Sequence, residues 1–192
     1  MKRRTLLAAA PLAAIVLAAR AARADNETAA WAALQGGGCA ILLRHAQTEP
    51  GIGDPPGFRL DECSTQRNLS AAGRAQAQRF GAALRARGVR IDEVRSSRWC
   101  RCLDTARLAF PALAVQPFAP LDSFFEDRRT AAQQTAAVRR YLADLGPRNA
   151  LLVTHQVNIS ALTGQFAAMG EAVVVRPAAA DAAPVVGRLR VD

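Results

Sequence analysis

Lysine is almost missing from this chain, since Lys2 is the only one among 192 residues and every other basic side chain is an arginine. The arginines are scattered through amphipathic segments, without the basic block that nucleic-acid binding requires. The apolar run over residues 6–19 has only about 14 residues, whereas a membrane-spanning helix needs roughly 20. The sequence therefore argues against a nucleic-acid partner and against a stable membrane span.

The N-terminus has the features of an export signal. A basic start (Lys2, Arg3 and Arg4) precedes the apolar run, and Ala22-Arg23-Ala24 forms a cleavage site before Asp25. The arginine pair also fits a twin-arginine signal, so the export route stays open. We expect residues 1–24 to be removed and the protein to be periplasmic; the alternative is an uncleaved N-terminal anchor.

Cleavage would change the charge of the protein. The full chain has 25 basic and 16 acidic residues, for a net charge of +9. Residues 1–24 hold five of the bases and none of the acids, which leaves 20 against 16, or +4. So small an excess does not imply a polyanionic partner.

Residues 25–192 are predicted to form one domain, because neither a repeat nor a linker interrupts them. Strand and helix patterns alternate along it, which predicts an α/β fold: a three-layer α/β/α sandwich with a mainly parallel sheet. Two C-terminal segments, 171–175 and 184–191, have the pattern of a hairpin or of edge strands. The expected strands are 39–44, 93–96, 114–116 and 150–154, and the expected helices are 70–87, 99–110 and 130–145.

The chain has only two histidines, and each directly follows a short apolar strand pattern: His45 in CAILLRHAQTE and His155 in NALLVTHQVN. Ligands of open α/β sheets bind beyond the carboxyl ends of the strands, so both imidazoles are expected to point at one crevice. Arg44 adjoins the first histidine, and Arg101 follows the end of another strand. Arginine binds phosphate oxygens with its planar fork, and an imidazole can attack phosphorus, so the pattern indicates phosphoryl transfer.

Four segments, in order, resemble the histidine phosphatase superfamily, the phosphoglycerate-mutase-like proteins. LLRHAQTE is similar to the RHG motif, SSRWCRCLDTA to the SSxxxRAxxTA segment, LSAAGRAQAQRFGAAL to the helix between them, and LLVTHQVNISALTG to the segment of the second histidine. The resemblance implies that His45 forms a phosphohistidine and that Arg44 and Arg101 hold the phosphoryl oxygens. It also implies that His155 stabilises the transition-state charge, and that no metal or other cofactor takes part.

The chain departs from the family pattern at two positions. Ala46 replaces the RHG glycine, which is tolerable only if this residue avoids positive φ and a close backbone approach. Gln156 stands where phytase-like members carry an acid after the second histidine. The proton donor must then come from elsewhere; Glu126 and Asp127 are the candidates, with a carboxyl pKa raised by desolvation beside neighbouring phenylalanines. The alternative is that these acids only interact favourably with the dipole at the start of a helix.

Several other polar residues are candidates for the pocket. Gln47, Thr48 and Gln156 are expected to line the phosphate site, although a turn would select the first two equally well. Arg67 could reach the substrate from the loop or lie at the surface. Trp99 is expected in the core or at the rim of the pocket, and the same is expected of Phe124 and Phe125.

The four cysteines suit an exported protein. Cys39 is expected to be a small core residue. A disulfide from Cys63, preferably to Cys100 and otherwise to Cys102, would clamp the loop beside the site. The alternative is that the cysteines bind structural zinc, but their spacing does not include a CxxC pair.

The function expected from these features is that of a metal-independent phosphomonoesterase acting on a phosphorylated small molecule or glycan of the cell envelope. Two alternatives remain open: a non-catalytic phosphate-binding or anion-binding protein of the same fold, and a metal-binding protein that uses histidine and cysteine. The sequence predicts neither the substrate nor the oligomeric state.

Overall fold

The computed structural model describes residues 24–177 and 184–191. The predicted export signal, residues 1–24, lies outside the described residues except for Ala24, which is already part of a helix that extends to residue 36. Within the described ranges, no helix combines the length and hydropathy needed to cross a membrane.

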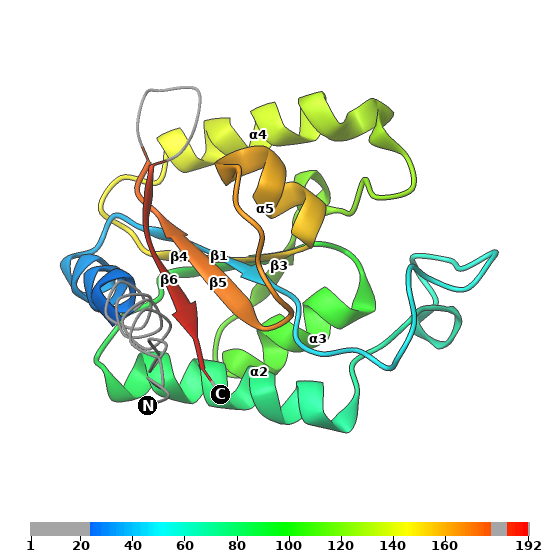
Figure 1. Cartoon of the computed structure of the whole chain (residues 1–192), viewed down its shortest axis with the longest axis horizontal. Helices are drawn as coiled ribbons and strands as arrows, with labels where there is room; N and C mark the ends of the chain where they lie inside the picture. Colours follow the sequence, from blue (N-terminus) through cyan, green and yellow to red (C-terminus); the bar gives the residue numbers. More distant parts are fainter. Residues whose placement is uncertain (1–23, 178–183, 192) are drawn as a thin grey trace, which may run out of the picture.

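A six-stranded sheet in the order β3-β2-β4-β1-β5-β6 forms the centre of the protein (Figure 1). The pairs β1–β4, β2–β4 and β2–β3 are parallel, whereas β5 is antiparallel to both β1 and β6. The C-terminal segments therefore form an antiparallel pair at one edge, and the prediction of a mainly parallel sheet is confirmed. The strands are β1 (Ala40–Arg44), β2 (Glu93–Ser96), β3 (Val115–Pro117), β4 (Ala150–Thr154), β5 (Glu171–Val175) and β6 (Val185–Arg190).

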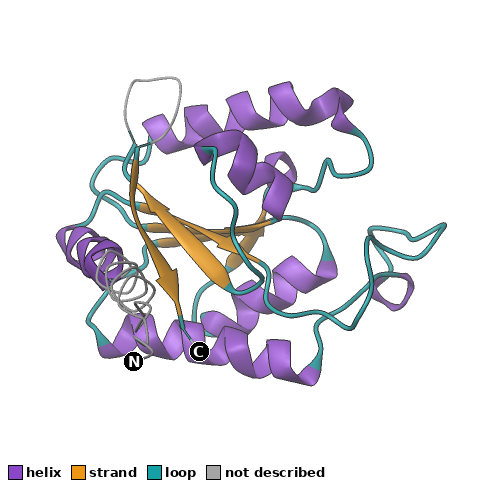
Figure 2. Ribbon diagram, viewed as in Figure 1, coloured by secondary structure: helices purple, strands orange, loops and turns teal. Residues whose placement is uncertain are grey.

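Helices cover both faces of this sheet, as Figures 1 and 2 show. On one side lie α2 (Ala71–Ala86), α3 (Cys100–Ala109) and the helix of residues 24–36; on the other lie α4 (Ala131–Ala143) and α5 (Gln156–Thr163). Short 3-10 turns, η1 (Cys63–Thr65), η2 (Ala119–Leu121) and η3 (Arg128–Thr130), lie in the connections. The three-layer α/β/α prediction is confirmed.

Alternation along the strands divides the core into two apolar clusters. In β1, Ile41 and Leu43 pack towards α2 and α3, whereas Ala40 and Leu42 pack towards α4 and α5. All four are buried, as expected for a central strand covered on both faces. This double burial explains why the sequence shows continuous apolar runs at these strands.

The helix ends follow local signals in the sequence. Ser70 caps α2, because its hydroxyl accepts a hydrogen bond from the backbone N–H of Gly73 at 3.1 Å. Gly164 ends α5 in the left-handed conformation, with φ of 70°. The observed bounds of α2, α3 and α4 lie within one or two residues of the predicted ones.

Helices α2 and α3 approach each other so closely at Gly81 that a Cβ there would overlap the carbonyl oxygen of Ala109. We expect Gly81→Ala to lower the free energy of unfolding by about 1–3 kcal/mol, because one helix backbone must move. Urea denaturation measures the loss. Gly36→Ala is the matched control, since a Cβ at position 36 meets nothing within 4 Å; equal stability of the two variants would contradict the prediction.

Candidate active site

The parallel pairing of β1 with β4 brings the two histidines together. Arg44 is in register with Thr154, so His45 and His155 leave neighbouring strands at the same level. The backbone N–H of His45 still donates to the carbonyl of Thr154 at 3.0 Å, which extends the ladder by one bond. The two rings lie edge to face, with centroids 5.5 Å apart.

His45 is held as a neutral imidazole. Its Nδ1 lies 2.9 Å from the carbonyl oxygen of Ala46. A carbonyl only accepts, so Nδ1 carries the ring proton and Nε2 keeps its lone pair. Burial, with the charge of Arg101 adding to it, lowers the pKa of His45 to about 3. Position 45 therefore offers an unprotonated nitrogen at neutral pH.

The backbone conformation explains why position 46, directly after this histidine, accommodates alanine. None of the described non-glycine residues has positive φ, and Ala46 is fully packed, with its N–H donated to the Thr105 hydroxyl at 3.0 Å. The close approach falls instead at Gly73, where a Cβ would overlap the backbone of Gln47. The glycine of the resembled motif is therefore dispensable here.

His155 is positioned by a hydrogen-bonded chain that the sequence did not reveal. Its Nε2 lies 2.9 Å from the Ser97 hydroxyl, which in turn lies 3.2 Å from Oδ1 of Asp122. Because a carboxylate only accepts, the hydroxyl donates to Asp122 and accepts from Nε2–H. Burial above all, with the neighbouring His45 and Arg101, lowers the pKa of His155 well below its usual value.

Three arginines surround the histidines: Arg44, Arg67 and Arg101 all line the same pocket. Burial lowers the pKa of Arg44, and the charges of Arg67 and Arg101 add to the effect. The Nε atoms of Arg44 and Arg101 are buried and make no hydrogen bond to any described residue. Buried guanidinium donors of this kind suit a bound oxyanion.

Asp54, on the loop after β1, pairs with the most buried of these arginines. Nη1 of Arg101 donates to both carboxylate oxygens of Asp54, at 2.7 and 3.0 Å, and both side chains are buried. Burial alone would raise the pKa of Asp54, but the hydrogen bond and charge of Arg101 lower it. The carboxylate is therefore ionised and fixes the guanidinium. An acid in a Gly/Pro-rich loop carries no local signal, so the sequence alone does not predict this pairing.

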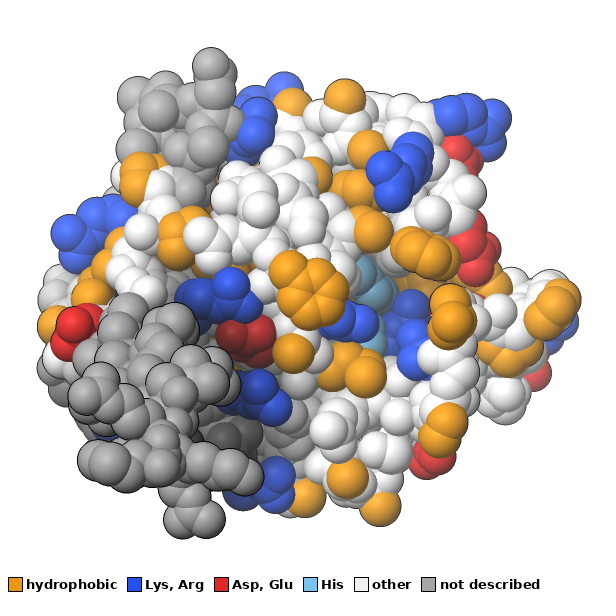
Figure 3. All heavy atoms as spheres, in the orientation of Figure 1, with side chains coloured by type: hydrophobic (Ala, Val, Ile, Leu, Met, Phe, Trp, Pro, Cys, Tyr) orange, Lys and Arg blue, Asp and Glu red, His pale blue; other side chains and the backbone are white. Residues whose placement is uncertain are grey.

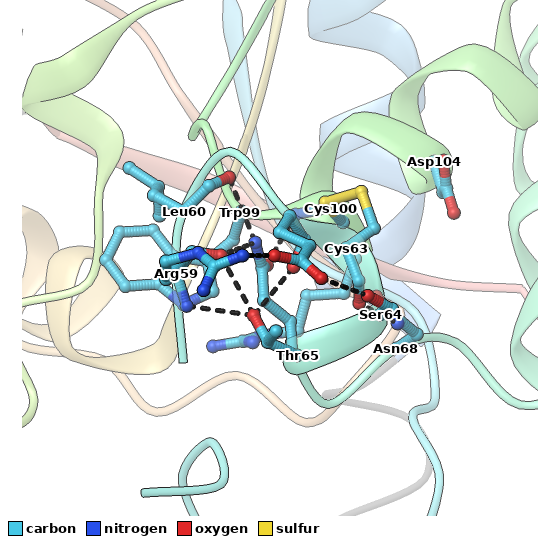
Figure 4. Close-up of a disulfide and its surroundings, with 12 residues drawn as sticks. Arg59, Leu60, Cys63, Ser64, Thr65, Asn68, Trp99, Cys100 and Asp104 are labelled. Carbon is cyan, nitrogen blue, oxygen red and sulfur yellow. Dashed lines mark hydrogen bonds and ion pairs between the residues drawn. A yellow bond between two sulfur atoms is a disulfide. The ribbon is translucent and has the colours of Figure 1, made fainter. Parts of the chain in front are cut away.

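The loop itself is attached to α3 beside the site (Figure 4). The disulfide joins Cys63 of η1 to Cys100, the first residue of α3, so the preferred pairing is confirmed. The amide oxygen of buried Gln66 accepts from the N–H of Cys100 at 3.0 Å and so caps the helix. Arg101 is the next residue. The loop therefore fixes Arg101 in two ways: through the ion pair with Asp54 and through the disulfide at the neighbouring Cys100.

The other two cysteines are buried free thiols. Cys39 lies in the core, as expected. Cys102 lies 3.5 Å from Nε2 of His155, and burial raises the pKa of its thiol to about 12, so it stays protonated. Among residues 24–177 and 184–191, no three His, Cys, Asp or Glu side chains converge as metal ligands.

Of the three polar residues expected to line the phosphate site, only Gln156 does so. Its amide is already bonded to the Ser160 hydroxyl and to the N–H of Ala167. Gln47 is exposed outside the pocket wall. Thr48 lies behind Arg67 and accepts a hydrogen bond from it. The expectation for Gln47 and Thr48 is wrong because the chain turns away after His45 and pairs with residues 68–70.

The two candidate acids lie at the pocket mouth. Asp127 forms an exposed ion pair with Arg129 at 2.6 Å, and hydrogen bonding to that arginine lowers its pKa to about 2. The prediction of a raised pKa is therefore wrong for Asp127. Glu126 is an exposed side chain that borders the pocket, so the desolvated position expected for it is not found.

The pocket has a volume of about 880 Å³ and is cationic at its base. Figure 3 shows the histidines at the bottom of a hollow, with arginine side chains beside them and apolar side chains around the opening. Trp99 lies on this wall, its ring 5.3 Å from that of His155. A base of buried donors below an apolar opening fits a phosphate group attached to a larger organic part.

Residues 40–126 match the family model of the histidine phosphatase superfamily (branch 1). Over this range the chain is similar to histidine phosphatases. The matched range contains His45, Arg44, Arg67 and Arg101, whereas His155 lies beyond it and joins the site through β4. No curated protein sequence matches the chain.

Solved structures share the fold of this domain. The protein histidine phosphatase SixA, solved with tungstate, has 13% identity and a TM-score of 0.58, and the match covers 79% of this chain and 96% of SixA. A mycobacterial glucosyl-3-phosphoglycerate phosphatase, solved with VO3, has 18% identity and a TM-score of 0.54, with 71% and 92% covered. YhfR of Bacillus stearothermophilus has 15% identity and a TM-score of 0.57, with 77% and 94% covered.

The buried neutral histidines make the stability of the domain depend on pH. Both pKa values are lowered in the folded state, so only the unfolded chain takes up protons just below its ordinary histidine pKa of about 6.5. Stability is therefore complete above that pH and falls as the pH drops towards about 3, the folded pKa of His45. We expect the free energy of unfolding to fall by about 2.5 kcal/mol between about pH 7 and pH 5.5.

Urea denaturation at the two pH values measures this loss. His155→Asn removes one of the two titrating groups and should show about half of it. Equal stability of the unsubstituted protein at both pH values would contradict the prediction.

Proposed function

We propose that this protein is a phosphomonoesterase that works through a phosphohistidine on His45. The observation that carries the proposal is the unprotonated Nε2 of a buried imidazole in a pocket whose base holds three arginines. The family match and the phosphatases of the same fold support phosphate chemistry. The substrates named for these two phosphatases differ, so the organic part of the substrate must be inferred from this chain's own pocket.

The reaction has two steps. In the first, Arg44, Arg67 and Arg101 hold the phosphoryl oxygens and Nε2 of His45 attacks phosphorus. A bond from phosphorus to nitrogen forms, the ester bond breaks, and its electron pair leaves with the alcohol oxygen, which takes a proton. In the second step, water attacks phosphorus and the electron pair of the nitrogen bond returns to His45.

His155 is proposed to stabilise the transition state. Its Nε2 is committed to Ser97, so Nδ1 is the nitrogen left for the phosphoryl group. As negative charge builds up next to it, the ring can take up a proton and donate a hydrogen bond, with Asp122 and Ser97 fixing its orientation.

Glu126 is proposed as the group that exchanges protons with the leaving alcohol and with the attacking water. It borders the pocket, and Asp127 is committed to Arg129. Asp54 is committed to Arg101 in the same way. The exposed position of Glu126 also lets water take over the exchange.

The charge compensation in this proposal comes from side chains, and the reaction is therefore proposed to be independent of metal. The three arginines supply the positive charge that a metal ion provides in other phosphatases.

We also propose that the protein acts in the cell envelope. The signal-like residues 1–24 support this location, and so does the Cys63–Cys100 disulfide, because such bonds persist in oxidising compartments.

Replacing His45 tests the mechanism. We expect His45→Asn to lower kcat/KM for para-nitrophenyl phosphate by at least about 10³-fold, because the nucleophile is lost. Brief mixing of the unsubstituted protein with substrate, followed by alkaline quenching, should trap one acid-labile phosphoryl group per chain, measured by intact mass. Turnover that survives in His45→Asn would overturn the mechanism. Phosphate binding without turnover in the unsubstituted protein would instead favour a non-catalytic anion-binding protein.

Chelation tests metal independence. We expect kcat to stay within about twofold after prolonged dialysis against EDTA, since arginines hold the phosphoryl group. Loss of activity that returns when a divalent cation is added would contradict the proposal.

A further inference from the structure

The apolar side chains at the pocket opening are unusual for this molecule. Among the described residues, the exposed large apolar side chains are Ile52, Phe125 and Phe166, at 91%, 55% and 64% exposure, and all three border this one pocket. They come from three separate segments: the loop after β1, the connection before η3 and the connection between α5 and β5. Apolar side chains gathered from distant segments around one opening indicate a ligand that covers them.

The wall between this opening and the histidines is also apolar. Phe58 and Trp99 lie with ring centroids 5.8 Å apart, and Val157 and Met169 complete the wall. The indole N–H of Trp99 is donated to Asp54 at 3.0 Å, so Trp99 offers its ring rather than a donor. An apolar path therefore leads from the phosphoryl site to the surface.

Few polar groups on the wall are available to recognise hydroxyl groups. The amide of Gln156 is bonded at both ends within the protein, and Asp127 is paired with Arg129. The Ser123 hydroxyl already accepts from the N–H of Phe125, so its O–H and the Glu126 carboxylate are the side-chain groups left on this wall. A sugar with several hydroxyl groups would regain fewer hydrogen bonds here than it loses from water. The carboxylates at the opening, Glu126 and Asp127, also disfavour a second anionic group on the substrate.

We propose that the substrates are phosphate monoesters with an apolar aryl or alkyl group, which packs against Ile52, Phe125 and Phe166 while the phosphate meets the arginines. This inference rests on the proposed phosphomonoesterase function and names its substrate class. It selects against the phosphorylated glycan that the sequence left open. A pocket of about 880 Å³ accommodates a group much larger than phosphate.

A series of alkyl phosphates tests the substrate class, because the chain length changes with little effect on the reacting bond. Each buried methylene group is worth about fourfold in binding, so kcat/KM should be at least about tenfold higher for octyl phosphate than for ethyl phosphate. Glycerol phosphate and glucose 6-phosphate should be no better than ethyl phosphate. A preference for these polar esters would overturn the inference while leaving the phosphatase function intact.

Paired variants test which side chains provide the selectivity. Phe125→Ser with Phe166→Ser should reduce the octyl-to-ethyl ratio of kcat/KM by at least about fivefold, because apolar area at the opening is lost. The matched control, Phe125→Leu with Phe166→Leu, keeps apolar side chains at both positions and should retain most of the ratio. An unchanged ratio in the serine variant would overturn the assignment, as would a chain-length effect confined to micellar substrate.

Binding of phosphonates separates failure of this inference from failure of the proposed function, since they cannot be hydrolysed. Calorimetry should show at least tenfold tighter binding of octylphosphonate than of methylphosphonate. Equal affinities would overturn the apolar specificity even if every ester is hydrolysed. Tighter octylphosphonate binding without hydrolysis of any ester would support the specificity and overturn the phosphatase function.

Discussion

The parallel hydrogen-bonded pairing of β1 with β4 is the constraint on which the site depends. It places Arg44 opposite Thr154, so that the next residues, His45 and His155, leave the sheet at one level and meet. A slip of one residue would turn one imidazole to the opposite face of the sheet. Both strands are buried on both faces, and shifting either would disrupt two apolar clusters at once. The packing of the core thereby fixes the geometry of the chemistry.

The electrostatics of this crevice keep the His45 imidazole reactive but lower the stability of the folded protein. Burial and neighbouring guanidinium groups keep His45 unprotonated, and the same arginines repel one another until an anion arrives. Asp54 offsets part of that repulsion and fixes Arg101 through one guanidinium nitrogen, which leaves the buried Nε available. A phosphate monoester would supply the remaining negative charge. The same desolvated cluster of positive charge would therefore bind the phosphate monoester and keep His45 neutral.

The sheet and helices supply some residues of the site, and the loops supply the others. Strand ends supply His45, Arg44 and His155, and α3 supplies Arg101, whereas the loop after β1 supplies Asp54, Arg67 and part of the apolar opening. That loop is long and rich in glycine and proline, and the disulfide and Gln66 attach it to the start of α3. Loops that line a rigid sheet edge are where proteins of one fold acquire different substrates. The apolar character of this opening belongs to the loops and not to the strand ends that are proposed to bind phosphate.

Periodicity and capping signals in the sequence were enough to predict the strands, the helices α2, α3 and α4, the mainly parallel sheet and the two histidines at strand ends, because these features depend on neighbours in the chain. The helix of residues 24–36 and α5 were not predicted. The cysteine positions, in a chain expected to be exported, predicted the Cys63–Cys100 disulfide as the preferred pairing. The sequence did not predict the pairing of Asp54 with Arg101, the hydrogen bonds from Asp122 through Ser97 to His155, or the gathering of Ile52, Phe125 and Phe166. The placement of Gln47 and Thr48 in the pocket, from their position after His45, was wrong. These contacts join residues far apart in the sequence, and only the packing of the sheet, helices and loops decides which of them meet.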